Sequence, residues 1–135
     1  MPQEDYIKKE IDKLGKLLAK ALADLVRLKS KGQLSDALNV TDQTLRTELG
    51  IDLEALCALP QNELLPFLAA EKKLSNVQME LIADLLFESA ENDPAAVSKY
   101  TRALRIYEAV TETEPNYSIN RHFKIELIRR LLREA

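Results

Sequence analysis

Residues 74–115, LSNVQMELIADLLFESAENDPAAVSKYTRALRIYEAVTETEP, contain the clearest helix signals in the chain. Ser75 and Gln78 have the spacing of a capping box, in which each side chain accepts a hydrogen bond from a free backbone N–H at a helix start. Asp93 followed by Pro94 is typical of a second helix start, because proline fits the first helical position. Both starts lead into apolar residues at helical spacing, so the sequence predicts two consecutive helices.

Helical periodicity continues toward the N-terminus. Residues 6–29 place apolar side chains four and three residues apart, which predicts one long helix. A second pattern follows over residues 33–49 and ends at Gly50, which suits the residue after a helix end. Asp52 is the expected N-cap of a short helix that ends before Pro60. The apolar stripe of the first helix consists of Ile7, Ile11, Leu14, Leu18, Ala21, Leu25 and Leu28.

Three positions in these segments are less regular. Gly15 lies inside the long helix at a cost of about 1 kcal/mol relative to alanine, which suggests either a closely approaching neighbour or simple tolerance. Asn62 is the expected cap of the helix after Pro60. This cap would place Pro66 among the first helical residues, whose N–H groups have no partner within the helix.

The C-terminal segment predicts a last helix over residues 118–134. Its apolar residues cover more than half of the helix circumference, which is wider than the stripe of an ordinary surface helix. One neighbouring helix is therefore not expected to cover them all. These residues are Ile119, Phe123, Ile125, Leu127, Ile128, Leu131 and Leu132.

The chain as a whole predicts an all-α fold in a single domain, residues 1–135. No segment alternates apolar and polar residues, and no Asn-Gly or Asp-Gly turn occurs. The composition, 46% hydrophobic with 3 Gly and 5 Pro in 135 residues, argues against disorder. Five main helices and one or two short ones with short connections are expected to form stacked antiparallel helical hairpins.

Residues 99–118, KYTRALRIYEAVTETEPNYS, resemble the second helix and exit turn of a tetratricopeptide repeat. Ala103, Tyr107 and Pro115 fall at the positions of that family's small alanine, aromatic residue and terminal proline. Val110 stands where an alanine is usual. A small Ala103 lets a paired helix approach, Tyr107 fills the gap between hairpins, and Pro115 stops the helix.

This resemblance implies that residues 75–118 form one degenerate repeat-like unit, followed by the terminal helix. The alternative is an unrelated helical bundle. The segment EDYIKKEIDKLGKLLAKAL, residues 4–22, makes the chain resemble a family of small bacterial helical proteins of unknown function. That second resemblance brings no catalytic residues.

The sequence contains no recognisable catalytic, cofactor or metal site. The single histidine, His122, lies one helical turn before Glu126, and two ligands are too few for a metal site. Cys57 lies in an apolar helix, where a buried, unreactive thiol is the usual case. The glycines at positions 15, 32 and 50 are isolated, which argues against a phosphate-binding loop. We therefore predict a protein that is not an enzyme and has no cofactor.

Charge and hydropathy predict a cytoplasmic protein. The segment Met1–Lys9 carries four charges where a secretory signal needs an apolar core. A lone cysteine cannot form an intramolecular disulfide, and charges interrupt every apolar run before the roughly 18 residues of a membrane span.

Basic and acidic residues are distributed unevenly. Residues 1–33 carry a net charge of +3, residues 34–98 of −9, and residues 99–135 of +3. A basic strip on the last helix is a candidate contact for an acidic partner or a phosphate backbone; it consists of His122, Arg129, Arg130 and Arg133. A sequence pI near 5.3 argues against nucleic acid, because nucleic-acid-binding domains usually have a pI above about 9.

These observations favour a non-enzymatic module that binds another protein or peptide, or that associates with itself as a homodimer. One alternative is a helical bundle that binds a small apolar ligand, or an enzyme without a recognisable motif. A further alternative is weak nucleic-acid binding through the basic strip.

Overall fold

The computed structural model describes the backbone of residues 2–135 and the side chains of residues 13–135. Over residues 2–135 the chain forms helices and no strand, so the predicted all-α fold with five main helices is confirmed. The elements are α1 (Pro2–Ser30), α2 (Leu34–Leu49), α3 (Leu53–Ala58), α4 (Gln61–Leu65), a π-helix η1 (Pro66–Glu71), α5 (Asn76–Ser89), α6 (Ala96–Thr113) and α7 (Ile119–Glu134).

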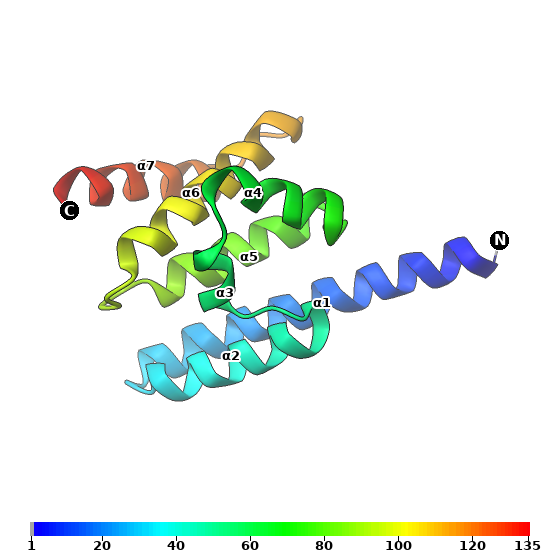
Figure 1. Ribbon diagram of the computed structural model, residues 1–135, viewed down its shortest axis with the longest axis horizontal. Coiled ribbons are helices and arrows are strands. Elements are labelled where there is room, and N and C mark those ends of the chain that lie inside the picture. The colour runs from blue at the N-terminus through cyan, green and yellow to red at the C-terminus, as the bar shows by residue number, and fades with distance from the viewer. Residues whose placement is uncertain (1) are drawn as a thin grey trace.

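The long helices form two hairpins and a final helix (Figure 1). α1 and α2 lie side by side, and α5 packs against both α6 and α1. α7 packs on α6, so α2 and α7 lie on opposite sides of the molecule. α1 continues past the end of α2 toward the N-terminus (Figure 1).

The buried core runs through all the long helices. Leu18, Ala21 and Leu25 of the predicted α1 stripe are buried. Ile7 and Ile11 lie outside the residues whose side chains the structure describes. α5 is the most buried helix, with eight of its fourteen residues in the interior. The largest fully buried side chains are Tyr107, Leu18, Leu25, Leu45, Leu56, Leu64, Leu68, Ile82, Leu85, Leu86, Ile106 and Ile128.

Local signals in the sequence fix most helix boundaries. The predicted capping box is present, with Gln78 N donating to Ser75 Oγ at 3.2 Å and Ser75 N donating to Gln78 Oε1 at 2.9 Å. Asp52 accepts from Ala55 N at 2.7 Å at the start of α3. Gly50 adopts a φ of +70° after α2, a conformation that costs glycine no steric strain.

The start of α6 differs from the prediction. The helix begins at Ala96, after an N-cap at Ala95, and not directly after Asp93. The Asp93 carboxylate accepts from Ala95 N at 2.7 Å and pairs with Lys99 Nζ at 2.8 Å. It therefore stabilises a turn that precedes the helix. The Lys99 hydrogen bond is the main reason that the pKa of Asp93 lies below its ordinary value.

The prediction that Asn62 caps the helix after Pro60 is wrong. α4 begins at Gln61, so Pro66 lies beyond the first turn, where a regular α-helix needs the backbone N–H that proline lacks. The helix continues past Pro66 as the π-helix η1, whose wider turn follows the missing hydrogen bond.

The structure also decides between the two explanations for Gly15. A methyl group added at Gly15 would meet no neighbouring atom within 4 Å. No helix in the described part of the chain approaches the backbone closely there, so this glycine is simply tolerated. Among the described residues, no helix is long and apolar enough to cross a membrane.

Candidate interaction surface

The residues that resemble a tetratricopeptide repeat lie mostly in the interior. Ala103, Tyr107 and Val110 are buried in α6, and Pro115 is exposed in the turn that follows. Tyr107 is the largest fully buried side chain among the described residues. Ala103, Tyr107 and Val110 therefore position the helices and are not available to a ligand.

The four residues of the predicted basic strip are all exposed on α7, but they differ in whether they form ion pairs. Arg129 pairs with Glu108 and with Glu126, in both cases at 3.0 Å. Arg130 and Arg133 form no ion pair with any side chain that the structure describes. Arg129 therefore divides the strip, because its charge is already neutralised within the molecule.

The N-terminal end of α7 and the turn before it carry large apolar side chains. Tyr117, Ile119 and Phe123 are 73%, 74% and 65% exposed, and they lie within seven consecutive residues. The other large apolar side chains that are exposed in the described part of the chain are valines on α1, α2, α5 and α6. Large apolar side chains that are exposed close together indicate a contact surface, whereas singly exposed valines do not.

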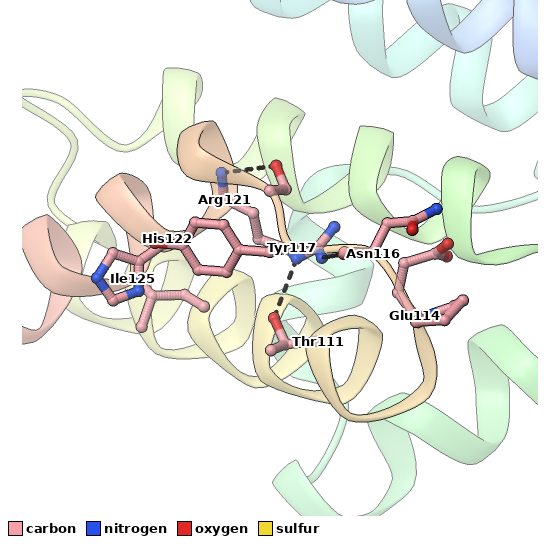
Figure 2. A pocket seen from close by; sticks show the side chains of 9 residues that line it. Thr111, Glu114, Asn116, Tyr117, Arg121, His122 and Ile125 are labelled. Carbon is pink, nitrogen blue, oxygen red and sulfur yellow. Dashed lines mark hydrogen bonds between the residues drawn. The ribbon is translucent and has the colours of Figure 1, made fainter.

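A pocket of about 250 Å³ adjoins this patch at the turn between α6 and α7. Figure 2 shows Tyr117 and His122 near each other on one side of it and Glu114 on the other. The two aromatic rings have centroids 5.7 Å apart. The turn begins at Pro115 because proline cannot continue α6, and Ser118 caps α7 by accepting from Arg121 N at 3.2 Å.

Arg121 is one of the residues that line this pocket. Its guanidinium donates to Glu80 Oε1 at 2.7 Å and to Thr111 Oγ1 at 3.0 Å, while only 6% of its side chain is exposed. A longer contact of 3.4 Å reaches the carbonyl of Asn116. The charge of Arg121 is therefore satisfied by α5, so this residue holds α7 in place and leaves no free cation in the pocket.

A second buried group attaches α7 to α5 and α6. Asp84 of α5 accepts from the hydroxyl of Tyr107 and pairs with Lys124 Nζ at 2.8 Å. Burial and the neighbouring Asp84 carboxylate raise the pKa of Tyr107, so its hydroxyl stays protonated and donates. Lys124 also lies 5.8 Å from the ring centre of Phe87, within range of a cation–π contact.

We define the α7 surface as Tyr117, Ile119 and Phe123 together with the adjoining pocket.

The sequence indicated excess apolar area on α7 without showing which residues stay exposed. The Asp84 and Arg121 contacts escaped sequence reasoning because their partners are 23 to 41 residues away. The one available signal was a charged residue, Asp84, within the otherwise apolar segment 81–87.

Two further charged side chains, Lys29 and Arg102, also hold helices together. Lys29 of α1 pairs with Glu91 at 2.7 Å and with Glu88 at 3.3 Å. Arg102 of α6 donates to the carbonyl oxygens of Leu56 at 3.1 Å and Leu59 at 2.7 Å, and so caps the end of α3.

Cys57 has the properties of a structural thiol. Its side chain is half-buried, and burial raises the pKa of the thiol. A raised pKa leaves less thiolate, the form that acts as a nucleophile. Among residues 13–135, no three His, Cys, Asp or Glu side chains are arranged to hold a metal ion.

Comparisons with protein-family models, with curated proteins and with solved structures find no match for this chain.

Proposed function

We propose that this protein is a non-enzymatic interaction module that binds a protein chain through the α7 surface. One observation carries the proposal: three large apolar side chains stand exposed within seven residues, and one of them, Tyr117, lines a pocket. Burying an exposed apolar side chain of this size contributes about 1.5–3 kcal/mol, so an interface centred on three of them provides a substantial driving force.

The way α7 is attached supports this proposal. Arg121 and Lys124 both form ion pairs with α5 from the side of α7 that faces the core. Rotating α7 to bury Phe123 would break both pairs and leave Glu80 and Asp84 without their cations. The exposed face of α7 is therefore a stable feature of the folded chain.

The repeat-like architecture is part of the same proposal. In tetratricopeptide repeats, each helical hairpin stacks on the next and cannot cover its outer face alone. If residues 75–118 form one such unit, α7 is the helix on which a further layer would stack. A protein partner on the outer face of α7 would take the place of that layer.

Photo-crosslinking tests this proposal. The photoreactive amino acid p-benzoylphenylalanine replaces Phe123, and in a control chain it replaces Val40, an exposed apolar residue on α2, on the opposite side of the molecule from α7. After irradiation in the cells that make the protein, we expect a protein adduct from position 123 and none from position 40. Mass spectrometry then identifies the adduct. Equal labelling at both positions, or none at position 123, would overturn the proposal.

A further inference from the structure

A second pocket, of about 460 Å³, lies between the end of α3 and the π-helix η1. Its volume falls within the range of small-molecule sites, which usually measure about 300–1,000 Å³. None of its residues belongs to the α7 surface, so it is a separate candidate site. The residues that line it are Leu59, Glu63, Pro66, Phe67, Ala70 and Glu71.

The π-helix η1 supplies four of these six residues. After its wide turn, Lys72 N donates to the carbonyl oxygen of Phe67, five residues earlier, at 2.9 Å. Turns of this kind are rare and are frequent at functional sites. The residues that form the unusual turn therefore also form most of the pocket.

The pocket combines four apolar residues with two carboxylates. Glu63 and Glu71 are exposed, and neither side chain forms an ion pair or accepts a hydrogen bond in the described part of the chain. Other acids of the acidic stretch 34–98 are neutralised by basic residues within the fold. Those that form ion pairs are Asp52, Glu80, Asp84, Glu88, Glu91 and Asp93.

The ring of Phe67 already has a cation beside it. Lys72 Nζ lies 5.5 Å from the ring centre, within range of a cation–π contact, and no described ion pair joins Lys72 to a carboxylate. Two carboxylates and one ammonium group give this region a net charge of −2 + 1 = −1. One further positive charge would neutralise it.

We propose that this pocket binds a small organic cation, namely one amino or guanidinium group on an apolar body. The apolar body packs against Phe67 and its apolar neighbours, and the cation pairs with the carboxylates of Glu63 and Glu71. Apolar contact contributes to affinity whatever the charge of the ligand, whereas the carboxylates favour a cation and repel an anion. The site is independent of the proposed function.

Three probes with the same apolar body and different charges test the site. They are 4-phenylbutylamine, 4-phenylbutanol and 4-phenylbutyrate, which carry charges of +1, 0 and −1 at neutral pH. Titrations followed by ¹⁵N NMR should shift the backbone amide signals of Phe67 and Ala70. Each exposed carboxylate is expected to contribute about 2- to 5-fold, so the amine should bind at least about fourfold more tightly than the alcohol. The carboxylate probe should bind most weakly.

Replacing both carboxylates tests their role. The double variant Glu63→Gln, Glu71→Gln should bind the amine and the alcohol equally. Glu134→Gln removes an exposed carboxylate at the far end of α7 and should keep the preference for the amine (Figure 1). Both probes are compared on the same variant, so a folding defect would weaken both and would not change their ratio.

A peptide probe distinguishes a small ligand from a protein segment. If acetyl-Leu-Arg-Leu-amide binds more than tenfold more tightly than the amine, the pocket takes an arginine of a partner chain and the small-ligand proposal is wrong. The proposal also fails if wild type binds the amine and the alcohol equally, if the preference survives the double substitution, or if only α7 signals shift. None of these results changes the crosslinking outcome at position 123, so the two proposals can fail separately.

Discussion

Tyr107 shows how one residue can serve both the core and the placement of a surface. Its ring is fully buried in α6, and its hydroxyl donates to Asp84 of α5. Asp84 in turn binds Lys124 of α7. A buried carboxylate is costly unless it is hydrogen-bonded and paired, and here two helices supply the two partners. The position of α7 therefore depends on a residue that has no direct part in the exposed surface.

Tyr107→Phe should destabilise the fold by about 1–2 kcal/mol, because it removes one hydrogen bond from a buried carboxylate and leaves the ring packing intact. Urea unfolding would measure this change as a lower midpoint with an unchanged slope. Tyr117→Phe is the matched control, since the Tyr117 ring is exposed. Its expected effect is within about 0.5 kcal/mol. Equal midpoints for the two variants would contradict this role of Tyr107.

At the scale of elements, glycine and proline act according to the backbone around them. Gly50 has a φ of +70° and ends α2, whereas Gly15 lies in the interior of α1 with open space around it. Pro66 does not end its helix but changes the helix type. Residue type alone therefore does not determine where an element stops.

Gly15→Ala should stabilise the protein by about 0.5–1 kcal/mol, because alanine loses less conformational entropy in a helix and meets no neighbour at this site. Gly50→Ala should destabilise it, since an alanine is strained at positive φ. Thermal unfolding followed by circular dichroism would compare the two variants. Shifts of the same sign would refute the distinction between these positions.

For the whole molecule, ion pairs within the fold join the basic ends of the chain to part of its acidic middle. Lys29 from the basic N-terminal region pairs with Glu88 and Glu91 of the acidic middle. Arg121 of the basic C-terminal region pairs with Glu80 of α5, which also belongs to the acidic middle. α5 receives ion pairs from both ends of the chain and also packs against α1 and α6, so it is the element that unites the fold.

Native-state hydrogen exchange should reflect this central position of α5. We expect its amides to exchange most slowly, because eight of its fourteen residues are buried, compared with four of sixteen in α2 and three of sixteen in α7. Mass spectrometry of peptides from dilute protein would measure the order. Slower exchange in α2 or α7 than in α5 would show that the stability lies elsewhere.

The sequence by itself determined the features that depend on neighbouring residues. Helical spacing predicted all five long helices, and the caps at Ser75 and Asp52 lie where the sequence placed them. These signals are readable because a cap or an apolar stripe acts within a few residues of chain. The start of α6 was missed because the Asp93 carboxylate does not cap the helix. It accepts from Ala95 N and pairs with Lys99, and these contacts stabilise the turn before the helix.

Only the tertiary structure decided which side of α7 faces the core. Its apolar residues cover more than half of the helix, so several orientations would bury similar apolar area. The choice is made by Arg121 and Lys124, whose partners Glu80 and Asp84 lie 41 and 40 residues away on α5. A buried charge must meet its counterion, and that requirement leaves Tyr117, Ile119 and Phe123 at the surface.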